Sequence, residues 1–426
     1  GDVNGDGHQD LIQSDGAGTV AILNGNGLGS FTSSRWARLT GTTSTLKVAD
    51  YNGDGRADLA IADSTEDALA PIGWMEVSTD GRTMQAAIAA LRQRRNAVIL
   101  AHYYQEEAIQ DIADFIGDSL ELSRKAAATD ADVIVFCGVH FMAESADILT
   151  TQNQRVILPD LAAGCSMADM ASITAVEDCW ATLEKLGVAS RTVPITYMNS
   201  TAAIKAFTGR NGGAVCTSSN AERALTWAFA QAEKILFLPD QHLGRNTAVL
   251  KLGLSLSDCV VWNPWKAQGG LTDDEIKNAK VILWRGHCSV HGRFSVDNIT
   301  EIRSRVDGVQ VLVHPECQHS VVSAADVVGS TEFIIKTVEN SPAGSRWAIG
   351  TELNLVQRLA LKHTDKQIYF LDKTVCYCST MNRIDLPHLV WAMETAAKGR
   401  VVNQIIVDSD VASYARVALE RMLALP

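Results

Sequence analysis

Three cysteines of this sequence stand in loop-like segments with glycine or polar neighbours. Cys165 lies in LAAGCSMADM, Cys288 in RGHCSVHGRF and Cys378 in VCYCSTMNRI. Thiolates are natural ligands of iron-sulfur clusters, and a cluster held by three thiolates leaves one iron open as a Lewis acid. Their long sequence intervals match no compact CxxC motif, so zinc bound by the same thiols and a histidine is the competing interpretation.

Polar residues also follow the predicted apolar strands. In open α/β sheets, reactive groups gather where strands end and helices begin, because backbone donors and helix N-termini converge there. Strand ends rich in His, Tyr, Ser, Thr and Glu are not easily explained by packing alone. The residues at these strand ends are His102, Tyr104, Tyr197, Asn199, Thr217, Ser218, His287, His291, His314, Glu316, Ser330 and Thr331.

The framework that must position these residues is predicted from Thr83 onward. The amphipathic segment MQAAIAALRQRRN and the strand AVILAHYYQ are typical of parallel α/β units. Apolar strands that end in Pro and an acid recur at Pro159, Pro239 and Pro315, which indicates three similar units, with chance similarity among buried strands as the alternative. We expect each unit to open with another strand, near residues 98, 193 and 281.

These patterns predict an α/β fold of three similar three-layer α/β/α domains behind a short β-rich fragment. We expect the fragment at residues 1–72 and the domains at residues 83–175, 176–262 and 263–350. The last segment, 351–426, is expected to complete the first domain and carries the third loop cysteine.

The first 70 or so residues differ from the rest, because DVNGDGHQDLI recurs there as DYNGDGRADLAI. Oxygen side chains at alternate positions suit calcium, but the position of the bidentate Glu of an EF-hand holds Gln13 and Ile61. The segment resembles a truncated repeat of FG-GAP or VCBS β-propeller proteins. The expected calcium ligands are Asp2, Asn4, Asp6 and Asp10, then Asp50, Asn52, Asp54 and Asp58.

Composition narrows the class of protein. A net charge of −12 without long basic runs argues against a nucleic-acid partner. No apolar stretch reaches the roughly 18 to 20 residues that a membrane span needs. The nine cysteines are scattered without the density of a disulfide scaffold, which favours a reducing cytoplasm, and Cys137 and Cys216 lie in apolar runs typical of buried thiols.

The ordered segments of residues 83–426 resemble quinolinate synthases. They include AHYYQ at 101, GDSLELSR at 117, AGCSMAD at 163, TYMNS at 196, FLPDQHLGRN at 237, WRGHCSVH at 284, HPEC at 314, GTE at 350 and CSTMNRIDLPHLVWAME at 378. The resemblance implies a cytoplasmic transferase of NAD biosynthesis that condenses iminoaspartate with dihydroxyacetone phosphate, losing phosphate and two waters. It also implies a 4Fe-4S cluster, a pseudo-threefold triangular arrangement of the domains, and a functional link to the enzyme that makes iminoaspartate.

The resemblance also implies residue roles. Cys165, Cys288 and Cys378 match the cluster ligands, whereas Cys317 and Cys376 match no ligand position. The proton-transfer residues would be Tyr104, His314 and Glu316. The residues that would hold substrate carboxylates and phosphate are His102, Ser119, Tyr197, Asn199, Ser218, His291, Ser330 and Thr331.

Three alternatives stay open at this point. An aconitase-like iron-sulfur hydro-lyase would act on citrate-like acids. A calcium-dependent interaction module would act through residues 1–70, and such repeats belong to extracellular proteins, where an oxygen-labile cluster is out of place. A structural zinc protein would contain zinc without inorganic sulfide.

Overall fold

The computed structural model of the chain describes five strands between residues 11 and 63, and residues 88–93, 96–373 and 377–425. The chain divides into two compact units, Gly1–Ala87 and Ile88–Pro426. Among the helices described, none has both the length and the apolar character that crossing a bilayer requires.

The first unit is built from antiparallel strands, as expected for a β-rich fragment. Its strands are β1 (Leu11–Ser14), β2 (Thr19–Gly25), β3 (Phe31–Arg38), β4 (Thr43–Ala49) and β5 (Asp58–Asp63). The order β1-β2-β3 forms one sheet and β4-β5 another. Of the expected calcium ligands, only Asp58 falls within a described strand, and the others lie outside the described residues: Asp2, Asn4, Asp6, Asp10, Asp50, Asn52 and Asp54.

The second unit contains three sheets, and the first has the order β19-β9-β8-β6-β7. Its strands are β6 (Ala97–His102), β7 (Phe115–Gly117), β8 (Val133–Cys137), β9 (Arg155–Ile157) and β19 (Gln404–Ile405). All pairs are parallel except β19 with β9. The run VIVFC of β8 is buried along its whole length, as expected for a central strand covered on both faces.

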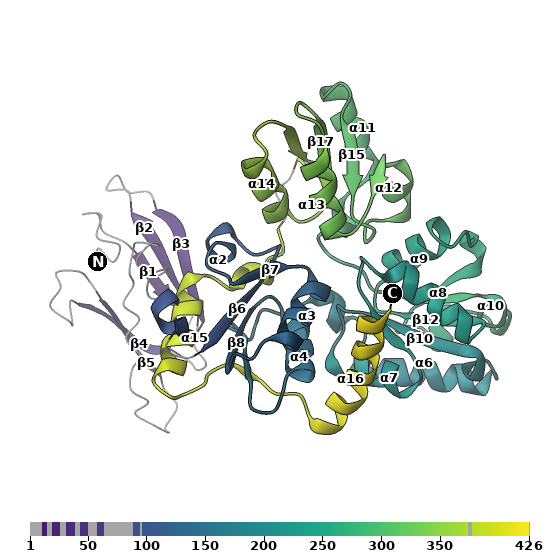
Figure 1. The fold of residues 1–426 in the computed structure, drawn as a ribbon, viewed down its shortest axis with the longest axis horizontal. Helices are drawn as coiled ribbons and strands as arrows, with labels where there is room; N and C mark the ends of the chain where they lie inside the picture. The colour runs from purple at the N-terminus through teal and green to yellow at the C-terminus, as the bar shows by residue number, and fades with distance from the viewer. Residues whose placement is uncertain are drawn as a thin grey trace. The chain divides into compact units, whose positions relative to one another are not determined.

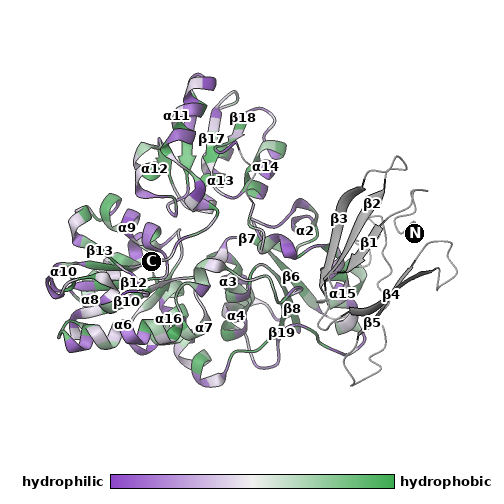
Figure 2. Cartoon of the chain, turned by 180° about the vertical axis from the view of Figure 1, so that it is seen from behind, coloured by the Kyte–Doolittle hydropathy of each residue, from purple (hydrophilic) through white to green (hydrophobic). Residues whose placement is uncertain are grey.

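The second sheet is entirely parallel and has the order β11-β10-β12-β14-β13. Its strands are β10 (Thr192–Tyr197), β11 (Ala214–Cys216), β12 (Lys234–Leu238), β13 (Cys259–Trp262) and β14 (Val281–Trp284). Leu236, Ile282 and Trp284 belong to a core that joins this sheet to its covering helices. Figure 2 shows the same pattern, with hydrophobic strands inside and hydrophilic residues on outer helix faces.

The third sheet is also parallel and has the order β16-β15-β17-β18. Its strands are β15 (Gln310–Val313), β16 (Val327–Val328), β17 (Arg346–Gly350) and β18 (Gln367–Phe370). Separate apolar cores lie on its two faces. The α/β class is therefore confirmed, and each of the three sheets with its covering helices is called a domain below.

The helices connect these strands and cover the sheets (Figure 1). In the first domain they are α2 (Glu107–Gln110), α3 (Ser119–Ala128), α4 (His140–Leu149) and α5 (Ser166–Asp169). In the second they are α6 (Ile173–Lys185), α7 (Ala202–Arg210), α8 (Ala221–Gln231), α9 (Gln241–Leu250) and α10 (Asp273–Asn278). The remaining helices are α11 (Val296–Arg305), α12 (His319–Ala324), α13 (Thr331–Asn340), α14 (Leu353–Lys362), α15 (Leu386–Ala397) and α16 (Ser409–Ala424).

Several helices and strands differ from the expected boundaries. Helix α10 was expected in the third domain but packs through Ile276 on the core of the second sheet. Strand β14 was expected to open the third domain but pairs in parallel with β12 and β13 of the second sheet. Helix α14 and strand β18 were expected to complete the first domain but belong to the third, where β18 pairs with β17. The reason is that apolar strands of similar composition fit any of these sheets, and only the connections decide which one they join.

The C-terminal segment returns to two domains. Strand β19 adds to the first sheet, as expected, whereas α16 packs along α7 of the second domain (Figure 1). Gly209 of α7 permits this approach, because a Cβ atom there would collide with the backbone oxygen of Tyr414. The crossing point therefore depends on glycine for close packing of the helices.

Candidate active site

One pocket of the second unit is lined by residues from all three domains. Its walls come from strand ends and the loops that follow them, as the parallel sheets predict. All the predicted site residues except Ser330 line it: His102, Tyr104, Ser119, Cys165, Tyr197, Asn199, Ser218, Cys288, His291, His314, Glu316, Thr331 and Cys378. Further lining residues are Asp118, Val139, Phe141, Met142, Thr217, Val290 and Met381.

Ser330 stands apart from the pocket lining. It occupies the N-cap position of α13, where its hydroxyl accepts a hydrogen bond from the Phe333 N–H at 3.4 Å. A serine before a helix has this capping role in many proteins. Thr331, the next residue, reaches the pocket instead.

Glu316 is a buried acid with partners in two other segments of the pocket. The Tyr197 hydroxyl donates a hydrogen bond to its Oε1. His291 Nδ1 lies 2.9 Å from its Oε2. Burial alone would raise the pKa of Glu316, but the neighbouring His291 and His314 rings and the Tyr197 hydroxyl together lower it to about 2. Glu316 is therefore a buried, ionised carboxylate.

His102 and His314 are neutral rings in the pocket, and both have the tautomer that carries its hydrogen on Nε2. The Tyr104 N–H donates to His102 Nδ1 at 3.1 Å, and the Glu316 N–H donates to His314 Nδ1 at 3.3 Å. A ring nitrogen that accepts a hydrogen bond carries no proton, so the hydrogen of each neutral ring is on Nε2. Burial lowers the pKa of each histidine to about 3. Both rings therefore offer one N–H donor.

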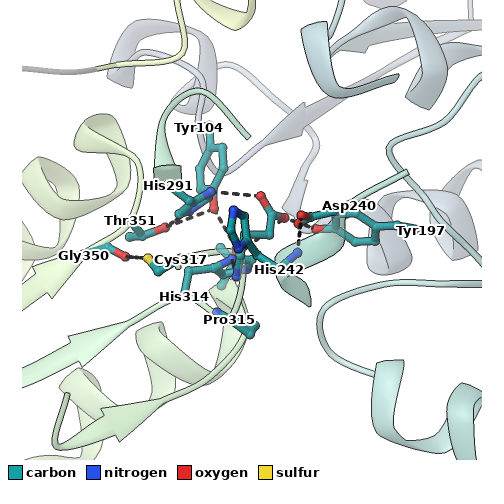
Figure 3. Close-up of polar contacts among 12 residues, drawn as sticks. Tyr104, Tyr197, Asp240, His242, His291, His314, Pro315, Cys317, Gly350 and Thr351 are labelled. Atoms are coloured by element: carbon teal, nitrogen blue, oxygen red, sulfur yellow. Dashed lines mark hydrogen bonds and ion pairs between the residues drawn. The ribbon is translucent and has the colours of Figure 1, made fainter. Parts of the chain in front are cut away.

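Thr351 connects the Glu316 network to Tyr104. Its Oγ1 lies 3.1 Å from His291 Nε2 and 3.1 Å from the Tyr104 hydroxyl (Figure 3). The Tyr104 hydroxyl also lies 3.1 Å from Thr331 Oγ1. Burial first, and then the Glu316 charge, raises the pKa of Tyr104 well above 10. The result is a continuous chain of polar groups from a carboxylate to a protonated phenol.

Sequence reasoning did not select Thr351. A signal was present, because Thr351 follows strand β17 directly and lies in the GTE segment that carries the family resemblance. The rule that polar residues gather at strand ends would have included it. Its partners could not have been predicted, since they come from segments far away in sequence.

Two helices begin at the pocket with different caps. Ser119 and Thr331 are the first residues of α3 and α13. The Asp118 carboxylate caps α3 by accepting hydrogen bonds from Leu120 N and Glu121 N, so a negative charge already occupies that N-terminus. Helix α13 has the neutral Ser330 cap, and the Glu332 of its first turn is paired with Lys336.

The three loop cysteines meet at this pocket, whereas other described cysteines do not. Cys165, Cys288 and Cys378 all line it. Cys137 and Cys216 are completely buried in sheet strands, which confirms that they pack as small apolar side chains.

The donor set at the pocket fits a metal centre. Burial, together with the smaller effect of the nearby Cys378, raises the pKa of Cys165 to about 12. Burial also raises the pKa of Cys288, with Glu316 and Cys165 adding to the effect. Thiols that repel one another as thiolates need a bound cation to ionise together. In addition, Cys288, His291 and Glu316 bring ligand atoms within 4.8 Å of one another.

Asp240 is a further buried acid near this network. It is the N-cap of α9 and its Oδ1 accepts a hydrogen bond from His242 N at 2.8 Å. Figure 3 shows it beside Tyr197. Burial and the Glu316 charge raise its pKa well above the ordinary value of 3.8, so the pKa values of the two acids shift in opposite directions.

Comparison with known proteins gives a consistent result for both parts of the chain. The family described as quinolinate synthetase A protein matches residues 86–424, and the FG-GAP-like repeat matches residues 2–61. A quinolinate synthase of Streptomyces coelicolor is 65% identical over 331 residues, covering 77% of this chain and 84% of that protein. One of Nocardioides is 65% identical over 349 residues, covering 80% and 88%. One of Acidobacterium capsulatum is 55% identical over 354 residues, covering 82% and 95%.

Proposed function

Because the chain belongs to the quinolinate synthase family, we propose that it condenses iminoaspartate with dihydroxyacetone phosphate to form quinolinate, with release of phosphate and water. The observation that carries this proposal is the single pocket at which three loop cysteines meet the Glu316 and Tyr104 network. The reaction would make the chain a transferase of NAD biosynthesis.

A 4Fe-4S cluster would be held by Cys165, Cys288 and Cys378. Each of the three domains would then contribute one ligand to the cluster. When bound, the cluster would supply an open iron that acts as a Lewis acid toward substrate oxygens. The zinc alternative needs a histidine to complete the thiol set.

The proton chemistry would run through Tyr104. Its hydroxyl gives its proton to Thr351 Oγ1, while Thr351 gives its own proton to His291 Nε2. Glu316 then stabilises the positive charge on the His291 ring. A histidine that is itself oriented by a carboxylate is the common device by which enzymes activate a weakly acidic hydroxyl such as that of Tyr104. His314 would act as a second proton donor through Nε2.

Substrate binding would rely on neutral donors. The carboxylates and the phosphate would be held by His102, Ser119, Tyr197, Asn199, Ser218, His291 and Thr331, with Ser330 acting through the helix that it caps. Hydroxyl, amide and imidazole donors bind anions without forming ion pairs that would slow release.

The substrate and the cofactor suggest the cellular setting. Imines hydrolyse in water, so we infer a functional link to the enzyme that makes iminoaspartate. The described cysteines are free thiols, which agrees with the reducing cytoplasm that an oxygen-labile cluster requires.

The test is anaerobic purification of the chain, iron and sulfide analysis, and an assay for quinolinate. We expect close to four irons per chain, and loss of both iron and product when Cys165, Cys288 or Cys378 is replaced by Ser. Cys259→Ser, outside the pocket, is the matched control and should keep both. Equal loss with Cys376→Ser would show that the third ligand is misassigned.

The same assay separates the alternatives. Turnover of citrate-like acids without quinolinate would indicate an aconitase-like hydro-lyase. Zinc without sulfide would indicate a structural metal site. We expect a chain that lacks residues 1–70 to keep full activity, whereas a calcium-dependent interaction module would lose its function.

A further inference from the structure

Lys205 of α7 is a buried charged residue outside the pocket lining. Its side chain has 0% exposure, and its Nζ donates a hydrogen bond to the backbone oxygen of Ser200. Nζ also lies 5.3 Å from the centroid of the Phe141 ring. Moving an ammonium group out of water is costly unless a charge or a specific function compensates.

Lys205 stands one layer behind the pocket wall. Phe141, over which its ammonium group lies, lines the pocket. The turn that accepts its hydrogen bond carries two more lining residues, Tyr197 and Asn199. The Ser200 hydroxyl donates to the Tyr197 backbone oxygen at 2.8 Å, so this turn is internally fixed.

The charges of the pocket lining create a need for a cation. The lining residues include the acids Asp118 and Glu316 and three thiols, and they include no Lys or Arg among the residues that the structure describes. The proposed substrates are anions. The positive charge of Lys205 also acts on Cys165 and on Glu144 of α4. Burial lowers the pKa of Lys205 to about 8, so the ammonium form predominates at pH 7.

We propose that Lys205 is a positioning residue that attracts the anionic substrate electrostatically through the pocket wall formed by Phe141 and Asn199. The identity of the anion rests on the proposed function, and the group that Lys205 attracts would be a carboxylate or a phosphate.

The expected effect on affinity is about tenfold, because a unit charge about 10 Å from an anion acts at an effective dielectric constant of about 20.

Lys234 provides a matched control in the same domain. It is also a buried lysine, with 4% exposure, but its Nζ donates to the backbone oxygens of Lys277 and Ala279. It begins β12, at the end of the strand opposite to the pocket. Its replacement therefore removes a buried ammonium group and its hydrogen bonds without changing the charge near the site.

The test compares Lys205→Gln, Lys205→Met and Lys234→Met with the unchanged full chain at equal iron content. The Gln side chain keeps a hydrogen-bond donor near the Ser200 oxygen. Lys205→Gln should therefore fold even if Lys205→Met does not. We expect the Lys205 variants to raise the Kd of succinate, of inorganic phosphate or of both about tenfold, and to raise KM while kcat stays within about twofold. Succinate alone would locate a carboxylate near Lys205, and phosphate alone would locate the phosphate.

Kd values of both anions that stay within about twofold in a folded Lys205→Gln protein would overturn the inference. An equal rise of Kd in Lys234→Met would overturn it too, because the effect would then come from lost stability. If the unchanged chain makes no quinolinate, the proposed function fails, while the Kd comparison still tests Lys205.

Discussion

Replacing Thr351 by Val would remove one hydroxyl from the centre of the polar network and keep the size of the side chain. Thr351 Oγ1 is the group that lies 3.1 Å from both His291 Nε2 and the Tyr104 hydroxyl. General acid and base groups contribute roughly 10² to 10⁴ in rate, so kcat should fall by about that factor when the link is lost. Tyr104 keeps its contact with Thr331, so the unpaired group is mainly His291 Nε2.

The stability cost of this change should be moderate. A buried donor or acceptor left without a partner costs about 1–3 kcal/mol, which is less than the usual 5–15 kcal/mol of a folded domain. Thermal unfolding and iron content should therefore show a folded, cluster-bearing protein. The assay is single-turnover and steady-state formation of quinolinate under anaerobic conditions.

Thr351→Ser is the matched control, because it keeps the hydroxyl and removes only a methyl group. We expect it to retain activity within about tenfold of the unchanged chain. If Thr351→Val is folded, carries its iron and keeps kcat within about threefold, the chain of hydrogen bonds does not carry the proton, and Tyr104 must exchange it by another route.

Three further predictions concern stability and the cysteine loops. Gly209→Ala should lower the free energy of unfolding by about 1–3 kcal/mol, measured by denaturant titration, because the new Cβ collides with the Tyr414 oxygen at the helix crossing. The pKa of His102 falls to about 3 in the folded state from an unfolded value of about 6.5, so the folded chain binds fewer protons there. The free energy of unfolding should therefore decrease as the pH falls from 6.5 toward 3. His102→Gln should reduce that pH dependence by at most about 1.4 kcal/mol per pH unit. The ion pair of Arg383 Nε with Asp160 Oδ2 at 2.8 Å joins the loops of Cys165 and Cys378, two of the proposed cluster ligands. Arg383→Met should therefore speed iron loss in air several-fold, and equal loss rates would contradict this.

Much of the fold could be predicted because it depends on local patterns. Runs such as VIVFC and KILFL predict buried parallel strands, and they are buried at every position. The expected place of β14 in the third sheet was wrong, because its apolar run VILW suits the second and the third sheet equally well. Local composition sets the type of element, while sheet membership depends on connections and packing.

The candidate site shows the same division. Nearly all the predicted residues line one pocket, since each lies at a strand end or in the loop that follows. Ser330 has the right position but turns back to cap its own helix. Thr351 follows strand β17 directly, so its position gave a signal, but its two partners lie in other segments and could not be predicted. The individual roles of these residues stay predictions until variants are measured.

The sequence by itself determined which chemical groups the protein has and that they stand at strand ends, because residue type and the periodicity of apolar side chains are local properties. It also determined the family. Only the tertiary structure decided which groups meet, in which protonation state, and which charges lie behind them. Burial and the approach of distant segments set the ionised Glu316, the neutral His314 and the enclosed Lys205, and no single stretch of chain contains those effects.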